Sequence, residues 1–200
     1  MQRELSSPAS MPASWTNVSP WLRSAGAVIL GSLLLAVCAR VSVPLWFTPV
    51  PLSLQPFGVL LLGLVLRPRL AATALIAYLA EGAAGLPVFA PTPVPMGGLV
   101  HLLGPTGGYL LAYPMAGALI SAHWRRTRRS FSMALVSAAL GDMLILVCGA
   151  AWLRLEAHAA APASFATAVL AFLPGDALKV AASAGIAAGW QRFNRHDRRG

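Results

Sequence analysis

Two ionisable residues of opposite charge stand three positions apart near the C-terminus of the chain. Asp176 and Lys179 lie within the long apolar stretch 163–190, and Lys179 is the only lysine present. This spacing puts both side chains on one face of a helix. An ionisable residue at membrane depth is costly and marks a functional site. Lys179 could bind the carboxylate of a small organic anion while Asp176 accepts hydrogen bonds from its N–H groups; alternatively, the two residues form a structural pair in which Lys179 snorkels.

The dipeptide Pro174-Gly175 directly precedes this pair. Proline followed by glycine predicts a break in the chain and the start of a new helix. The free N–H groups and partial positive charge of a helix N-terminus would add to carboxylate binding. Discontinuous helices of this kind line the substrate sites of many transporters.

Three further residues in apolar surroundings could take part in chemistry. Glu81 either accepts hydrogen bonds from a ligand or lies solvated at the aqueous boundary, and His101 faces either the site or water. Asp142 lies in the middle of an apolar run. There it either pairs with polar groups of neighbouring helices for structural reasons or belongs to the site.

The elements that must position these residues are membrane helices. The chain is 57% hydrophobic and only 10% charged, whereas soluble domains carry about 25% charged residues. We therefore predict an all-α integral membrane protein with six transmembrane helices. These are expected at about residues 21–39, 52–66, 70–84, 104–124, 131–153 and 174–190.

The predicted membrane domain covers residues 21–191. A disordered or interfacial tail precedes it at residues 1–20, and a basic cytoplasmic tail follows at residues 192–200. The first apolar run, which ends at Val37-Cys38-Ala39, also fits a signal peptide or a lipidation site. We favour a membrane span because more apolar runs follow it.

Basic residues are distributed unevenly between the connections. Twelve arginines flank the start of the first span, the connections after the second and fourth spans, and the end of the sixth span, whereas only Arg40 and Arg154 fall on the other side. By the positive-inside rule, both termini are cytoplasmic and the Asp176–Lys179 pair lies toward the outer face. Short basic clusters between apolar runs indicate the orientation of the chain in a membrane, and they argue against nucleic-acid binding.

The connection at residues 85–103 is long, rich in proline and apolar, which is unusual for a free linker. We expect it to form a packed lid over the site.

In the first span, Ala27 and Gly31, and likewise Ser32 and Ala36, form small-xxx-small pairs that permit close approach of another helix. We expect this face to contact a partner.

No catalytic motif is present in the sequence. It contains no Gly-x-Ser-x-Gly, His-Glu-x-x-His or phosphate-cradling glycine-rich loop, so the chain cannot use ATP alone. Its histidines lack the spacing of metal ligands. Cys38 and Cys148 lie in apolar spans and are expected to be buried thiols. We predict no cofactor.

Four motifs, in order, carry a resemblance to a known family. They are VPLSLQ at residues 50–55, GLPVF at 85–89, GPTGGYL at 104–110, and LPGD at 173–176 followed by Lys179. Over about residues 25–190 the chain resembles the BioY-type biotin-binding S-components of energy-coupling factor (ECF) transporters. Ser53 stands where that family commonly has threonine, and Glu81 where an uncharged residue is common.

The resemblance implies six membrane helices with a vitamin site near the outer face. It implies biotin as the transported ligand, with Asp176 and Lys179 among its contacts. Gln55, Gly107, Gly108 and Tyr109 of the matching motifs complete the expected binding set with Glu81 and His101. The implied partners are a transmembrane scaffold subunit and two ATPase subunits, in contact with membrane lipid. A stand-alone vitamin transporter, or an intramembrane enzyme using Asp142, Asp176 and Glu81, remain as alternatives.

Overall fold

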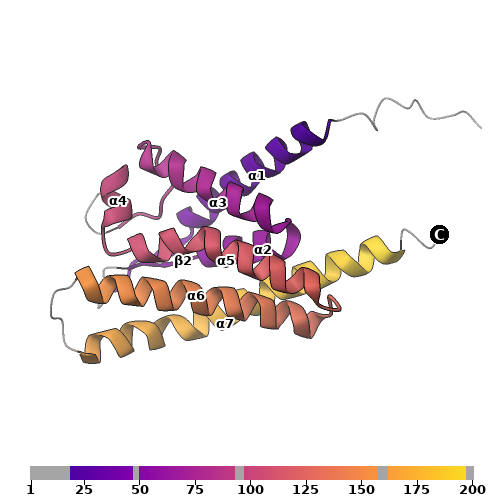
Figure 1. The fold of residues 1–200 in the computed structure, drawn as a ribbon. Helices are drawn as coiled ribbons and strands as arrows, with labels where there is room; N and C mark the ends of the chain where they lie inside the picture. The colour runs from indigo at the N-terminus through magenta and orange to yellow at the C-terminus, as the bar shows by residue number, and fades with distance from the viewer. Residues whose placement is uncertain (1–18, 47–49, 93–96, 157–161, 197–200) are drawn as a thin grey trace, which may run out of the picture.

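The computed structural model describes residues 19–46, 50–92, 97–156 and 162–196, and for residues 156, 162–171 and 194–196 it describes the backbone alone. Within these ranges the chain forms a helical bundle with one small β-hairpin (Figure 1). The elements are α1 (Pro20–Arg40), β1 (Ser42–Val43), β2 (Leu52–Ser53), α2 (Gln55–Val65), α3 (Pro68–Ala83), α4 (Leu99–Leu103), α5 (Gly107–Arg126), α6 (Phe131–Glu156) and α7 (Pro162–His196).

Local sequence explains where several helices begin. Proline occupies one of the first two positions of α1, α2 and α3, where its missing N–H would have no partner in any case. The hydroxyl of Ser19 accepts a hydrogen bond from the N–H of Leu22 at 3.3 Å and caps α1. Between helices α1 and α2, the short strands β1 and β2 pair antiparallel with Ser42 opposite Ser53.

Helix α5 packs against α2, α3 and α6 in the middle of the bundle. Glycines allow this close approach: a Cβ atom added at Gly63 of α2 would lie 2.8 Å from Cβ of Ile120 in α5, and one added at Gly108 of α5 would lie 2.8 Å from the carbonyl oxygen of Cys148 in α6. Both distances are below any real contact, so these glycines set the spacing of the helices.

The six longest stretches of helix match the six predicted spans in position, but they do not all have the length of a membrane span. Among the described residues, Pro20–Arg40 and Phe131–Leu155 are the only helices long and apolar enough to cross a bilayer by themselves. Helix α2 has 11 residues, about 16 Å at the usual rise per residue. Because a bilayer core is about 30 Å thick, six full crossings remain a prediction.

The basic connections gather at one end of the bundle. The start of α1, the turn between α5 and α6, and the C-terminal part of α7 all lie at the right in Figure 1, whereas α4 and the end of α6 lie at the left. Arg40 is at the end of α1 and Arg154 is in the last turn of α6, both away from that basic end. This arrangement fits the predicted division of charge.

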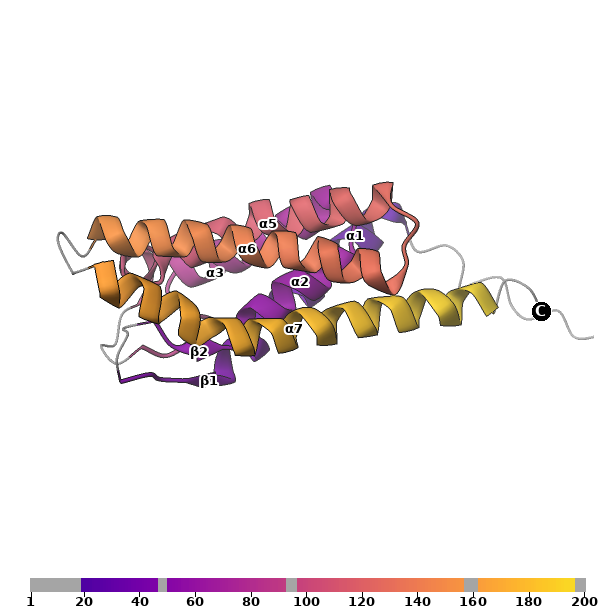
Figure 2. The same ribbon diagram turned by 90° about the horizontal axis from the view of Figure 1, so that it is seen from below.

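The predicted helix break at Pro174-Gly175 is wrong. Helix α7 continues from Pro162 to His196 with Pro174 inside it, and Figure 2 shows it bent rather than split. Proline removes one backbone hydrogen bond and kinks a helix without ending it when neighbouring elements support the remainder. Helix α7 therefore has no N-terminus at Pro174-Gly175, and the free N–H groups expected there are absent.

The predicted ends of the membrane domain stay largely untested. Residues 1–18 and 197–200 lie outside the described residues. Helix α7 runs past the predicted boundary at residue 191.

Candidate functional site

A cavity that is partly continuous with the solvent opens between the β-hairpin, α2, α4, α5, α6 and α7. Its wall is mainly apolar and aromatic, with a few polar groups, as in most small-molecule sites. The residues that line it are Val50, Pro51, Ser53, Gln55, Pro56, Ala90, His101, Thr106, Tyr109, Leu110, Tyr113, Asp142, Ile145, Leu146, Phe172, Asp176 and Lys179.

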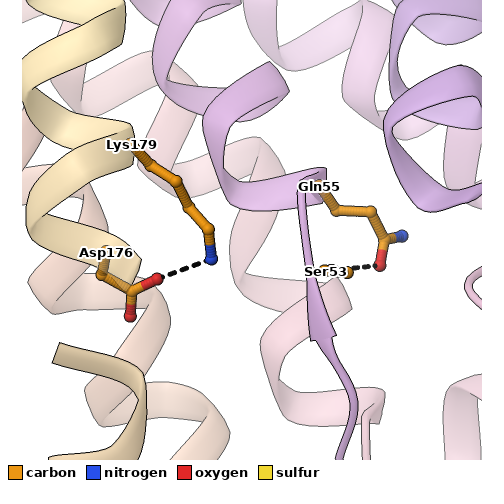
Figure 3. Close-up of polar contacts among 4 residues, drawn as sticks. All are labelled: Ser53, Gln55, Asp176 and Lys179. Carbon is orange, nitrogen blue, oxygen red and sulfur yellow. Dashed lines mark hydrogen bonds and ion pairs between the residues drawn. The ribbon is translucent and has the colours of Figure 1, made fainter. Parts of the chain in front are cut away.

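The predicted ion pair lies in this wall. The ammonium of Lys179 donates to Oδ1 of Asp176 at 2.8 Å. The two residues are 8% and 3% exposed, respectively. Figure 3 shows Lys179 reaching from α7 to meet Asp176, which is one turn before it on the same helix. A helical separation of three residues suffices for this contact, so the pair forms without any helix break.

Gln55, at the start of α2, belongs to a chain of hydrogen bonds. Its Nε2 donates to the hydroxyl of Tyr78 at 2.5 Å, and this hydroxyl donates to the carbonyl of Val88 at 3.0 Å. The hydroxyl of Ser53 donates to Oε1 of Gln55 at 3.1 Å (Figure 3). These bonds link the β-hairpin, α2, α3 and the segment that was expected to form a lid.

That segment covers one side of the cavity with the residues that are described; residues 93–96 lie outside them. Ala90 and His101 line the cavity, and the ring centroids of Phe89 and His101 are 4.8 Å apart. The guanidinium of Arg40 donates to the carbonyl of Pro87. The segment is therefore packed, as the sequence predicts, and His101 is buried beside the cavity instead of facing water.

Two aromatic side chains lie close together in the cavity wall. Tyr109 of α5 and Phe172 of α7 have ring centroids 6.4 Å apart. Stacking against an aromatic wall suits a flat ligand ring.

Three residues of the expected binding set do not line the cavity. Glu81 accepts a hydrogen bond from the hydroxyl of Ser32, so its side chain points from α3 toward α1. Gly107 and Gly108 are packed against neighbours: an added Cβ would lie 2.0 Å from the carbonyl oxygen of Leu102 and 2.1 Å from Cβ of Trp152, respectively. These glycines permit close packing at the start of α5, and their contact with a ligand stays a prediction.

The face of α1 that was expected to contact a partner is partly used within the chain. Gly31 and Ser32 are buried; a Cβ at Gly31 would lie 2.9 Å from Ala74 of α3. Ala27 and Ala36 are half-buried. The prediction of a partner contact therefore stands for Ala27 and Ala36 alone.

The sequence left the role of one polar group of the cavity open and missed another. Asp142 of α6 lines it, although the sequence left open a purely structural pairing. Thr106, just before α5, has a buried hydroxyl without a hydrogen-bond partner. Among the described residues, no three metal-ligating side chains come together, and the donor set suits an organic ligand with both charged and neutral parts.

Comparison with known proteins agrees with the motifs. The sequence profile of the BioY family matches residues 8–196. The chain belongs to the BioY family. The match spans the whole helical bundle, including the pair on α7 and the residues around the cavity.

Several BioY proteins are similar to it in sequence. It is 37% identical over 160 residues to the probable biotin transporter BioY of Pyrococcus horikoshii, covering 80% of this chain and 91% of that one. It is 36% identical over 165 residues to the biotin transporter BioY of Rhodobacter capsulatus, covering 76% and 84%, respectively.

A solved structure shares the fold of this BioY protein. The crystal structure of an S-component for biotin from an ECF-type ABC transporter superposes with a TM-score of 0.78 at 24% identity, covering 92% of this chain and 95% of that one. The chain therefore has the fold of an ECF S-component, and it is a membrane protein of a transporter family.

Proposed function

We propose that this protein is the biotin-binding membrane subunit of a vitamin uptake transporter. The observation that carries the proposal is the buried Asp176–Lys179 pair in a cavity of a BioY bundle. Biotin has a carboxylate at the end of a flexible chain and a bicyclic ring system with a planar ureido part. Lys179 binds the carboxylate, and the aromatic wall at Tyr109 and Phe172 packs against the ring.

Burial gives this arrangement its affinity. A hydrogen bond to a charged group contributes about 1.5–3 kcal/mol, and ring burial adds hydrophobic free energy. Gln55 and His101 lie in the same wall and supply neutral polar contacts. The named biotin transporters among the relatives support this choice of ligand.

The protein captures biotin at the outer face and passes it inward together with other subunits. The end of the bundle that carries α4 and the β-hairpin is the outer end, because the arginine-rich connections gather at the opposite end. The sequence holds no nucleotide-binding motif. A scaffold subunit and two ATPase subunits supply the energy, and the likeness of the fold to an S-component of an ECF-type ABC transporter supports this.

Binding to the purified full-length chain tests the proposal. We expect isothermal titration with biotin, in detergent or nanodiscs, to give one saturable site without turnover of the ligand. If the chain shows a cooperative thermal unfolding transition, and is therefore folded, but fails to bind biotin, the choice of ligand is refuted. Uptake by cells that hold this chain without scaffold and ATPase subunits would favour a stand-alone transporter instead.

A further inference from the structure

Asp142 is a buried carboxylate whose charge is not matched by any contact. It lies in α6, lines the cavity and is 7% exposed. Across the described ranges it makes no hydrogen bond or ion pair, whereas the other cavity carboxylate, Asp176, accepts from Lys179 at 2.8 Å. The structure therefore holds one carboxylate that is already paired and one that is open to the cavity.

The groups around Asp142 do not offset its charge. Tyr109 and Tyr113 of α5, His101 of α4, and Asp176 and Lys179 of α7 share the cavity with it. Asp176 repels it and Lys179 attracts it, but the ammonium of Lys179 already lies against Asp176. Burying a charge without hydrogen bonds is costly. A hydrogen-bond donor on a ligand in the cavity would reduce this cost for Asp142.

Hydrogen bonds from N–H groups would satisfy this carboxylate. The ring of biotin is a cyclic urea with two N–H donors at the end of the molecule opposite its carboxylate. A ligand of this kind can therefore place its acid at Lys179 and its donors at a separate acceptor. Asp142 on α6 is such an acceptor, and it stands on a different helix from the ion pair.

We propose that Asp142 accepts the ring N–H groups of the ligand and thereby selects for ligands with N–H donors. This inference rests on the proposed function and assigns the two ends of the ligand to different carboxylates. Asp176 stays with Lys179 at the acid end. The sequence alone favoured Asp176 as the acceptor of N–H groups, because it could not show that Lys179 occupies that side chain.

Two ligands of equal size separate these assignments. Iminobiotin is biotin with its ring oxygen replaced by N–H, which turns the ring into a guanidinium cation with the same shape. Binding of both ligands is measured by titration to the full-length parent and to Asp142→Asn. Biotin offers neutral N–H donors to the carboxylate, whereas the guanidinium of iminobiotin also carries a positive charge and forms an ion pair with it. The loss should therefore be about tenfold for biotin and about a hundredfold for iminobiotin.

Two control variants accompany this measurement. Asp176→Asn should change the affinity for both ligands by the same factor, since it acts at the acid end that they share. Met143→Ala changes the residue next to Asp142, which is exposed on α6 and does not line the cavity. It should leave both affinities unchanged.

Thermal unfolding without ligand separates a binding role from a structural one. Asp142→Asn should melt at the same temperature as the parent or higher, because it removes an unmatched buried charge. A lower melting temperature, or an equal loss for both ligands, would overturn the inference, and so would iminobiotin failing to bind a parent that binds biotin. If the parent binds neither ligand, the proposed function itself fails.

Discussion

At the scale of single residues, the Asp176–Lys179 pair is better explained by ligand binding than by stability. Replacing a buried ion pair with apolar residues is often neutral or stabilising, so a pair at this depth adds little to the folded state. In this protein the pair faces a cavity instead of a closed core. This position favours a role of the two charged groups in binding a ligand within the cavity.

Removal of the lysine should therefore affect binding most. We expect Lys179→Ala to weaken biotin binding by about ten- to a hundredfold or more, because the ligand carboxylate loses a charged hydrogen bond. Titration calorimetry measures this loss. An amide of biotin, which has no carboxylate charge, should lose less.

Two further variants keep this result interpretable. Leu178→Ala, at the exposed neighbouring position, should bind biotin as the parent does. Lys179→Ala leaves Asp176 unpaired and lowers stability, whereas the double variant Asp176→Asn/Lys179→Met removes both charges and should recover the melting temperature without recovering binding. Unchanged affinity of Lys179→Ala would mean that the lysine is structural.

Residue identities alone could reveal some of the site but not its geometry. A lone lysine and an aspartate three positions before it stand out in an apolar run. By contrast, the direction of Glu81 depends on the rotation of α3, which turns it toward Ser32 of α1. Asp142 has apolar neighbours on all sides of α6, so no period in the sequence shows which face meets the cavity.

At the scale of elements, the segment at residues 85–103 joins the cavity to the bundle. Phe89 fills the space above Gly82, where an added Cβ would lie 2.0 Å from its ring. The hydrogen bond from Tyr78 to Val88 and the contact of Phe89 with His101 fix the described parts of this segment. Neither contact is covalent, so the segment can open by breaking a few weak interactions.

We expect this segment to become more protected when ligand binds. Amide hydrogen exchange at residues 85–103 should slow on addition of biotin, because the ligand fills the cavity beneath Ala90 and His101. Residues 127–130, which join α5 to α6 at the other end of the bundle, serve as the control and should exchange at the same rate throughout. Equal exchange at residues 85–103 with and without biotin would argue against a lid.

The extents of the helices followed from apolar runs, but the continuity of α7 did not. Charged and proline-rich connections mark helix ends clearly, as at Arg67-Pro68. Pro174-Gly175 carries the same signal and yet lies inside a helix. The difference is tertiary: a kinked helix persists where neighbouring helices hold both halves in place.

At the scale of the whole molecule, the distribution of arginines predicts the orientation in the membrane. Cysteines introduced at Trp46 and Arg128, in a chain without Cys38 and Cys148, should differ in their reactivity. Trp46 is exposed near the β-hairpin and Arg128 is exposed in the α5–α6 turn. In intact cells a membrane-impermeant thiol reagent should label only the cysteine at position 46. Labelling at position 128 alone would show that the orientation is the reverse of the predicted one.

The surface of α1 should carry the contact with the transporter partners. Bulky replacements at the half-buried Ala27 and Ala36 should abolish biotin uptake in cells with scaffold and ATPase subunits, and leave biotin binding by the isolated chain intact. Gly31→Leu is the matched comparison: it is packed against Ala74, so it should disrupt folding and binding together. Loss of binding on replacement of Ala27 or Ala36 would place these residues in the bundle's own packing.

The Asp176–Lys179 contact has a consequence for which anions the site attracts. A solitary ammonium at that depth would attract water or a stray anion, and the site would then be occupied by whatever is abundant. Because Asp176 already neutralises the ammonium of Lys179, an unrelated anion gains little by binding at this point. Loading then becomes an exchange of one carboxylate neighbour for another or a sharing between them, so specificity rests on the remainder of the ligand.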